Sequence, residues 1–490
     1  MKIVLVHYHL RSGGVTQVVF NQASALQKAG EEVLVLSGEM PPLPENWASI
    51  PVAAVPGLHY DRFRQAEPKP VSSTSFQDNT VSRNEKAETL ASSIEEAIRT
   101  HWHGGRADLI HIHNPLIRKN SLLIGALKKL AEQSPLLLQN HDLAEDFRPD
   151  VYIDEEYPQN CHYGAINSRD YDFLLKAGLT PAGLHLLPNE VRKLPVTRGL
   201  PKNKYIYPVR GIRRKNIGEA LFLSIFTGPA SQGTGIAITQ PPTTEQDMPI
   251  YNHWKKTAVK LGLPLEFEAG INSSFADVMG SAKAVLTTSV KEGFGFSFLE
   301  PWTASLAVVG RRIDYVCRDF EESGICMNTL YPALLIPAEY AEPEALKEKT
   351  SGSLMRLYNA FGLTVPSQIL NELDNVFSNN ELYDFGILDE EIQEKIIFLA
   401  AEDKIIRERI KKKNPVLETL AEWKNDPALV KANSDAILSA YSREAILKTI
   451  LEAYRKVLSP VKQSISRQRL LELYLDPQHL FLVGISPPET

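Results

Sequence analysis

The feature of this chain that most constrains its fold is a repeated alternation between short apolar runs and longer amphipathic stretches. Short apolar runs predict strands at residues 3–6, 32–36, 109–113 and 136–139. Apolar residues at helical spacing predict helices at residues 15–29, 94–100 and 121–132. Strands that alternate with helices pair in parallel through right-handed crossovers, so the first part of the chain predicts a doubly wound α/β domain.

The same alternation starts again near residue 203. Strands are predicted at residues 205–208, 235–239, 265–268, 284–289 and 306–310. Helices are predicted at residues 216–224, 254–261, 275–281 and 296–305. Proline, lysine, arginine and glycine gather at residues 192–203, a composition typical of a linker. Two doubly wound domains therefore follow one another.

Long helices dominate the chain after about residue 340. They are predicted at residues 345–361, 389–401, 404–412 and 434–458. Earlier in the chain, the polar stretch from Gln65 to Glu85 holds little apolar material and is predicted to be a long loop. We expect an N-terminal domain at residues 1–197, a C-terminal domain at 198–455 with a helical insertion at about 340–440, and a final segment at 456–490, whose return to the N-terminal domain is left open.

Composition and charge exclude several classes of function. With 490 residues, 43% of them hydrophobic and 23% charged, the chain has ample material for a full core. The net charge of −6 argues against a nucleic-acid-binding surface and a broadly cationic membrane face. No apolar run approaches the roughly 18 residues of a transmembrane helix, and the 3 cysteines form no ligand-like cluster. We expect a cytoplasmic protein that binds no nucleic acid and has no stable membrane insertion.

Two glutamates eight positions apart, Glu292 and Glu300, give the strongest functional signal. A predicted strand precedes them, Gly293 and Gly295 fall in the turn between them, and a short helix begins at Phe296. Such a turn points backbone N–H groups at an anion. One carboxylate in the turn and one about two turns into the helix would accept hydrogen bonds from the hydroxyl groups of one long polar ligand. The alternative is a solvated helix with two surface glutamates.

A basic turn follows the first strand of the second domain. Arg210 and Lys215 flank this turn, and the next helix opens directly after it. Two cations beside a helix N-terminus suit a diphosphate, because each charge-assisted hydrogen bond is worth about 1.5–3 kcal/mol. A solvated basic turn is the alternative, and it is in part the state expected for Arg213 and Arg214.

Polar residues also follow a strand of the first domain. Alternation along residues 109–113 places His111 and His113 on one face, and Pro115 ends the strand. His113 and Asn114 should lie at the carboxyl edge of the sheet, where open α/β sheets bind ligands. Ligand contact, a buried hydrogen-bonded histidine and a metal pair are all open interpretations, although no third metal ligand has a fitting spacing.

Two further strand ends carry candidate residues. His141 and Asp142 take the same position after the strand at residues 136–139. Gly13 and Gly14 occupy a strand-to-helix turn, where glycine allows backbone to approach a phosphate or a sugar closely. The alternative is a tight turn that needs glycine for its shape alone. The pattern is not Gly-x-Gly-x-x-Gly, so a dinucleotide fingerprint is absent.

Taken together, these motifs resemble retaining nucleotide-sugar glycosyltransferases of family 4. The matching elements follow in order over residues 1–310: Gly13-Gly14, His113-Asn114-Pro115, Arg210 with Lys215, and Glu292-Gly293-Phe294-Gly295 with Glu300. The resemblance implies the GT-B fold, in which two Rossmann-like doubly wound domains face a cleft, here with extra C-terminal helices. It also implies that the final helix, at residues 442–458, crosses back to the first domain.

The resemblance also implies a role for each donor-side residue. Arg210 and Lys215 would neutralise the donor diphosphate and stabilise it as a leaving group. Glu292 would hold hydroxyl groups of the transferred sugar, and Glu300 would bind the nucleotide ribose. Backbone amides of the turn would assist; they belong to Gly293, Phe294, Gly295 and Phe296.

The first domain would supply the other contacts. His113 would contact the sugar near the reacting carbon, and Gly13 and Gly14 would let the domain close on the phosphates. We expect three further residues on the acceptor side: Asn114, His141 and Asp142.

The function implied is transfer of a hexose, with retention of configuration, from a UDP-glucose or GDP-mannose type donor to a hydroxyl group of a small soluble acceptor. Members of the family generally need no metal, because arginine and lysine take that role, and we expect no cofactor. A nucleotide-sugar epimerase or phosphorylase on the same fold and a non-catalytic sugar-nucleotide binder are the alternatives. Assembly into a homo-oligomer is left open.

The chain departs from the family pattern at three places. Thr288-Ser289 stands where the family often has Pro-Ser, and Arg311-Arg312 stands where a Gly-Gly turn is common. The helical region at 340–440 has no clear counterpart, and oligomerisation and acceptor shaping are both open as its role.

Overall fold

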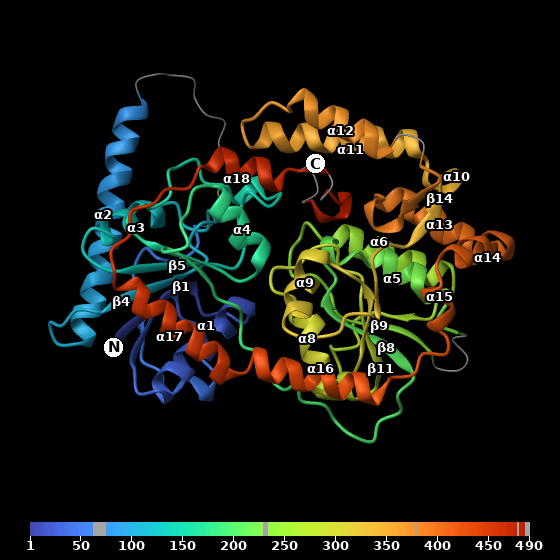
Figure 1. The fold of residues 1–490 in the computed structure, drawn as a ribbon, viewed down its shortest axis with the longest axis horizontal. Coiled ribbons are helices and arrows are strands. Elements are labelled where there is room, and N and C mark those ends of the chain that lie inside the picture. Colours follow the sequence, from blue (N-terminus) through green and yellow to red (C-terminus); the bar gives the residue numbers. More distant parts are fainter. Residues whose placement is uncertain (62–74, 229–233, 378–379, 478–479, 486–490) are drawn as a thin grey trace. The chain divides into compact units, whose positions relative to one another are not determined.

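The computed structural model describes residues 1–61, 75–228, 234–377, 380–477 and 480–485 (Figure 1). The chain divides into two compact units. Unit 1 comprises Met1–Glu190 and Tyr441–Tyr474, and unit 2 comprises Val191–Ala440 and Leu475–Thr490. We expected other bounds, with a division at residues 197/198 and a last segment from residue 456.

A break in a helix explains the largest difference in these bounds. The single helix expected at residues 434–458 is two helices, α16 (Pro427–Ala440) and α17 (Arg443–Val457). Ser442 caps the second helix, since its hydroxyl oxygen accepts a hydrogen bond of 3.4 Å from the backbone N–H of Ala445. The chain enters unit 1 at this break, and it returns to unit 2 after α18 (Arg467–Tyr474).

Unit 1 is built on a parallel sheet of seven strands in the order β3-β2-β1-β4-β5-β6-β7, which confirms the doubly wound prediction. The order reverses direction between β1 and β4, so the carboxyl edge at that point is the expected ligand site. The strands are β1 (Lys2–His9), β2 (Glu32–Glu39), β3 (Val52–Ala54), β4 (Leu109–His113), β5 (Leu136–Asn140), β6 (His162–Ala165) and β7 (Leu184–Leu186). The helices of the first stretch are α1 (Gly14–Lys28), α2 (Ser75–His101), α3 (Leu123–Leu130) and α4 (Ser168–Lys176).

Different helices cover the two faces of this sheet. Even-numbered apolar residues of β1 and β4 share one core with α2 and α3. On the opposite face, Gln22 of α1 donates from Nε2 to Oε1 of Gln139 on β5 at 3.2 Å, and Tyr454 of α17 lies 2.8 Å from Nδ1 of His111 on β4. The polar side chains of the strands therefore lie on the α1 and α17 side.

Helix α2 corrects one prediction. Residues 65–74 of the expected loop lie outside the described residues, but residues 75–85 are helical. The amphipathic second half of α2 buries Leu90, Ala91, Ile94 and Ile98. Adding turns to a nucleated helix costs little, so the packed half supports a polar first half that has no apolar stripe of its own.

Unit 2 repeats the design with a parallel sheet of six strands in the order β10-β9-β8-β11-β12-β13. The order reverses between β8 and β11, which places the second expected ligand site at their carboxyl ends. The strands are β8 (Lys204–Arg210), β9 (Gly235–Gln240), β10 (Leu265–Glu266), β11 (Ala282–Thr287), β12 (Val308–Arg311) and β13 (Leu330–Tyr331). The helices are α5 (Ile217–Ser224), α6 (Met248–Lys260), α7 (Phe275–Gly280), α8 (Phe296–Thr303) and α9 (Asp314–Glu322).

The helical region after residue 337 belongs to unit 2 and shares its core. Its elements are α10 (Ala338–Ala341), α11 (Pro343–Ala360), α12 (Ser367–Phe377), α13 (Glu390–Glu402), α14 (Lys404–Lys413) and α15 (Val416–Thr419), with a small antiparallel pair of β14 (Leu335–Pro337) and β15 (Leu382–Asp384). Helices α11 and α12 lie side by side (Figure 1). Ile392, Ile396 and Ile397 of α13 pack against α5 in the main core of the unit.

A buried ion cluster fastens this region to the sheet. Arg311, at the end of β12 and 1% exposed, donates to Glu219 of α5 at 2.7 Å and to Asp384 of β15 at 2.7 and 2.8 Å. Arg311 is thus a structural residue, and its side chain is occupied inside the unit. In the described part of the chain, no helix is long and apolar enough to cross a membrane.

Candidate active site

The basic turn after β8 is locked by hydroxyl groups from two strands. Residues Arg213–Lys215 form a short 3-10 helix that ends at Asn216, which adopts a left-handed φ of 49°. Tyr207 of β8 donates to the carbonyl oxygen of Lys215 at 2.7 Å, and Thr288 after β11 donates to the same oxygen at 2.9 Å. Thr288, where the family often has proline, therefore holds the backbone that positions Lys215.

Glu292 joins this turn through two cations. Its carboxylate makes ion pairs with Nζ of Lys215 and with Nη1 of Arg214, the latter at 3.0 Å. Arg214 also donates to the carbonyl oxygen of Lys291 at 2.6 Å. The structure therefore brings together Lys215 and Glu292, as predicted, and adds Arg214, which we had expected to be in part solvated. The basic run next to Lys215 was the signal for this residue.

Two of the three charged side chains are buried, and the side chain of Arg214 is 36% exposed. Lys215 and Glu292 are each 9% exposed. Burial acts to raise the pKa of Glu292, but the charges of Lys215 and Arg214 outweigh it and lower this pKa to about 2. Burial lowers the pKa of Lys215 to about 8. The charge of Glu292 raises this pKa, and the charge of Arg214 lowers it. Two cations share one carboxylate, so the cluster keeps an excess positive charge, as a site for an anion requires.

Tyr315 of α9 fixes the backbone at Glu292. Its hydroxyl group donates to the carbonyl oxygen of Glu292 and accepts from the N–H of the same residue at 3.1 Å. The turn that follows needs glycine at position 295, because φ is 88° there and a Cβ atom would lie 2.7 Å from Cγ1 of Val316. Helix α8 then begins at Phe296, with its N-terminus at the end of this turn.

Glu300 lies just over one turn into α8, not two turns as expected, because the helix begins at Phe296. Its side chain is half-buried, and no hydrogen bond or ion pair to it is present among the described residues. Burial raises the pKa of Glu300 to about 7. Arg210 is exposed at the end of β8 and makes no ion pair with Glu292 in the part of the chain that the structure describes. Both residues thus retain unused hydrogen-bonding capacity.

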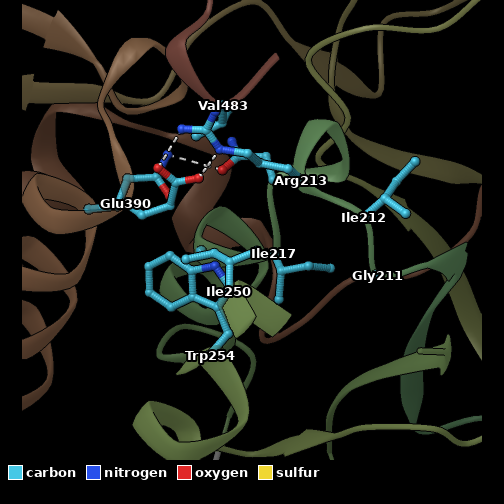
Figure 2. A pocket seen from close by; sticks show the side chains of 11 residues that line it. Gly211, Ile212, Arg213, Ile217, Ile250, Trp254, Glu390 and Val483 are labelled. Atoms are coloured by element: carbon cyan, nitrogen blue, oxygen red, sulfur yellow. Dashed lines mark hydrogen bonds and ion pairs between the residues drawn. The ribbon is translucent and has the colours of Figure 1, made fainter. Parts of the chain in front are cut away.

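Arg213 points away from the Glu292 cluster. Its guanidinium group pairs with Glu390 at the start of α13, and Nη1 donates to the carbonyl oxygen of Ile485 at 2.7 Å. Figure 2 shows Arg213 turned toward Glu390, with Val483 beside it. The pocket below has room for about one water molecule, ≈10 Å³. Arg213 is therefore a structural residue, and not a solvated cation. It connects the turn to the helical region and to the last described residues.

In unit 1, the histidines of the β4 edge are buried and stacked. The rings of His111 and His113 are 4.3 Å apart, which confirms that they share one face. Nδ1 of His113 shares a hydrogen bond of 3.1 Å with Nε2 of His141, and Nδ1 of His7 lies 3.3 Å from the carbonyl oxygen of His113. His7 and the hydroxyl group of Tyr454, which contacts His111, were missed because nothing in the sequence near β4 points to them.

These imidazoles are held neutral. Burial lowers the pKa of His7 and of His111 to about 3, and the pKa of His141 to about 4. Burial, with the neighbouring histidines, also holds the pKa of His113 well below its usual range. Nε2 of His113 is buried without a hydrogen-bond partner in the described residues. This buried, neutral imidazole thus keeps the capacity for one further hydrogen bond at Nε2.

Asn114 connects the ends of β4 and β5. It adopts a left-handed φ of 58°, and its Oδ1 accepts from the backbone N–H of His141 at 3.2 Å and of Asp142 at 3.1 Å. The predicted residues Asn114, His141 and Asp142 therefore form one edge with His113. Within the described residues, no group of three or more His, Cys, Asp or Glu side chains could hold a metal ion.

The glycines after β1 face open space. Gly13 has an extended φ of 175°, the nearest atom to an added Cβ at this position is 3.9 Å away, and no atom lies within 4 Å of one at Gly14. Neither packing nor a left-handed φ demands glycine here. The interpretation that glycine serves only the shape of the turn therefore loses support.

The chain is similar to known proteins over most of its length. No family model matches it. The mannosylglucosyl-3-phosphoglycerate synthase of Petrotoga mobilis is 26% identical over 433 residues, which are 80% of this chain and 80% of that protein. Among solved structures, sucrose-phosphate synthase of Thermosynechococcus elongatus has a TM-score of 0.51 at 15% identity, over 92% of this chain and 98% of that one.

A second solved structure gives the same fold. Anabaena HepE in complex with UDP-glucose has a TM-score of 0.51 at 13% identity, over 92% of this chain and 98% of that one. At these identities the structures speak for the fold alone, and the fold is the one that the motifs implied. With two Rossmann-like domains in this order and an alignment to a synthase over four fifths of both chains, the chain is a glycosyltransferase with the GT-B fold.

Proposed function

We propose that the chain is a retaining glycosyltransferase of family 4 that moves a hexose from a nucleotide diphosphate sugar to a hydroxyl group of a small soluble acceptor in the cytoplasm. The observation that carries the proposal is the cluster of Lys215, Arg214 and Glu292 at the point where the sheet of unit 2 reverses. Cations with excess positive charge suit a diphosphate, and a carboxylate between them suits sugar hydroxyl groups.

The donor is assigned to unit 2. Lys215 and Arg210 bind the diphosphate, with Arg214 as an additional cation. Glu292 holds hydroxyl groups of the hexose, aided by the backbone amides of Gly293, Phe294, Gly295 and Phe296. Glu300 accepts hydrogen bonds from the ribose, which suits a half-buried carboxyl group without a protein partner.

In the reaction, the bond between the anomeric carbon and the phosphate oxygen breaks through an oxocarbenium-like state. The acceptor oxygen bonds to that carbon from the same face, and its proton passes to the departing phosphate. Fixed cations stabilise the negative charge that develops on the leaving group. Lys215 and Arg214 supply this charge, which supports a reaction without a metal or another cofactor. Glu292 is held by both cations and serves as a binding group, unlike the nucleophile of a retaining hydrolase.

The acceptor is assigned to unit 1, with His113 near the reacting carbon and Asn114, His141 and Asp142 as polar contacts. Gly13 and Gly14 leave space for the donor phosphates. The HepE complex with UDP-glucose supports a hexose on UDP as the donor, and the name of the Petrotoga relative supports a product that contains hexoses.

Two measurements on the full chain test the proposal. A thermal-shift screen of UDP-, GDP- and ADP-sugars should single out one donor, since a ligand at 100 times its Kd stabilises the native state by about 2.7 kcal/mol. Incubation of that donor with glucosyl-3-phosphoglycerate, followed by NMR, should give a glycoside with the donor's anomeric configuration. An inverted product rejects retention, epimerised donor without acceptor indicates an epimerase, and binding without turnover of any acceptor indicates a binding protein.

A further inference from the structure

A second charged site lies at the carboxyl edge of unit 1, outside the histidine group. It surrounds the half-buried ring of Tyr60. Nζ of Lys119 lies 5.5 Å from the centroid of this ring, and the His9 ring lies 4.7 Å away on another side. Tyr8, which also contacts Tyr60 at 5.1 Å, reaches toward the carbonyl oxygen of Asn114 at 3.4 Å. The site is therefore continuous with the Asn114 edge.

Charged side chains of both signs gather here: Lys119, Arg148 and Arg11 lie among the carboxylates of Asp142, Asp150 and Glu39. Burial lowers the pKa of Lys119, and the charge of Arg148 lowers it further. Arg11 stands at the end of β1 on the same edge, where it pairs with Glu39. The charges of Asp150 and Asp142 offset part of this lowering of the Lys119 pKa, and an anion that binds between Lys119 and Arg148 would offset more of it.

Among the described residues, Arg148 makes only a long ion pair, with Asp142. Its ion pair with Asp142 spans 3.5 Å, whereas a charge-assisted N–H···O bond measures about 2.7–2.9 Å. Asp142 is 48% exposed and lies equally far, 3.5 Å, from Nδ2 of Asn114. By contrast, the ion pair of Arg169 with Asp146 elsewhere in unit 1 spans 2.8 Å, with side chains that are 14% and 10% exposed. A guanidinium group has five N–H donors, so Arg148 can bind an incoming anion without losing Asp142.

We infer that Lys119 and Arg148 form the subsite for an anionic group, a phosphate or a carboxylate, of the acceptor. Asp142 and Asn114 beside them take hydroxyl groups, so the edge recognises a small hydroxylated acid. This inference rests on the proposed function, because it assigns the acceptor of that reaction.

The chain offers a matched control for a test. Arg118 is adjacent to Lys119 and has the same charge, but it lines a different pocket of about 110 Å³ with Arg83. Its loss removes one positive charge from the same loop and leaves the Tyr60 site intact. Arg148→Lys keeps the charge and reports on folding.

The experiment is calorimetric titration of the full chain with 3-phosphoglycerate, with and without UDP, and with inorganic phosphate and D-glycerate as separate arms. Lys119→Ala and Arg148→Ala should each weaken binding of 3-phosphoglycerate at least tenfold, and Arg118→Ala should change it less than twofold. Arg148→Lys should restore most of the loss. Binding of phosphate alone identifies the anion as a phosphate, and binding of glycerate identifies a carboxylate.

Two outcomes overturn the inference. One is equal weakening by Arg118→Ala, which indicates diffuse attraction, and the other is no binding of any of the three anions to the wild-type chain. Thermal shift by nucleotide sugars on the same samples separates this failure from that of the proposed function. Lys119→Ala and Arg148→Ala should keep the wild-type shift, whereas its absence in the wild type rejects the transferase itself.

Discussion

The two sheets reverse their strand order in the same way, yet the edges at β8/β11 and at β1/β4 use opposite chemistry. The β8/β11 edge carries buried charges, with Glu292 ionised between Lys215 and Arg214. The β1/β4 edge carries buried imidazoles that burial keeps neutral, with His113 bonded to His141 at 3.1 Å. One topology thus supports either fixed charge or neutral hydrogen bonding, according to the residues at the strand ends.

This difference fits the proposed reaction. Negative charge develops on the leaving phosphate, where preorganised cations are most effective. Positive charge develops on the sugar carbon, where an imidazolium would repel it and a neutral imidazole does not. Substitutions that remove a charge from the β8/β11 edge or a neutral imidazole from the β1/β4 edge therefore test this difference.

The largest effect is expected from loss of charge at the β8/β11 edge. Lys215→Met should lower kcat/KM by about 10³-fold, the range seen for removal of one preorganised group that stabilises transition-state charge. Lys204→Met is the control, since Lys204 makes an exposed ion pair with Glu266. Steady-state rates with the preferred donor measure both. A fall of less than tenfold for Lys215→Met contradicts the role assigned to the cluster.

A smaller effect is expected at the β1/β4 edge. His113→Gln keeps a polar side chain but loses the imidazole, and it should lower kcat about 10²-fold while KM for the donor stays unchanged. Because burial lowers the pKa of His7 and His111 to about 3 and of His141 to about 4, these groups should add no inflection to the pH–rate profile above pH 5. A histidine-like inflection near pH 6.5 that His113→Gln abolishes would show that the edge is not neutral.

Glu300→Gln should separate stability from binding. The pKa of Glu300 is about 7 in the folded state and 4.5 in the unfolded state. The free energy of unfolding therefore falls as the pH rises from 4.5 to 7, and the full loss of stability is present above pH 7. At pH 8 the free energy of unfolding of the variant should exceed that of the wild type by about 1–2 kcal/mol, a value reduced because the side chain is partly exposed. Its KM for the donor should rise about tenfold, because one ribose hydrogen bond weakens. Denaturant melts at pH 4.5 and 8 provide the check, and an equal effect at both values rejects the assignment.

The smallest effect is a proton taken up on donor binding. A diphosphate beside Lys215 cancels the excess positive charge and raises its pKa from about 8, so at pH 8 the complex should bind up to half a proton more than the free components. Titration calorimetry with UDP in two buffers of different ionisation enthalpy measures this uptake. Lys215→Met should abolish it, and proton release in the wild type would show that the site holds no uncompensated cation.

Much of the architecture could be predicted from local pattern. Every predicted strand and helix of both series overlaps an observed one, although α2 begins at Ser75 and α6 at Met248, well before the predicted starts at 94 and 254. The ends of β4, β8 and β11 carry the candidates where parallel pairing requires them. The single helix expected at 434–458 was wrong, because the break at Ser442 depends on a cap and on the passage between units. The final helix that the resemblance implied at residues 442–458 is present as α17 and belongs to unit 1. The polar half of α2 gave no local signal because the packed half supports it.

The sequence by itself determined the two doubly wound sheets and the placing of Lys215, Glu292 and His113 at strand ends, because hydrophobic period and the alternation of strands with helices along the chain are local properties. Tertiary structure alone decided which carboxylates the arginines pair with. Arg214 reaches Glu292 across 78 positions, Arg213 reaches Glu390 across 177, and Arg311 joins Glu219 and Asp384 across 92 and 73. Which cation meets which carboxylate follows from how the strands and helices pack, and charge is not periodic along the chain.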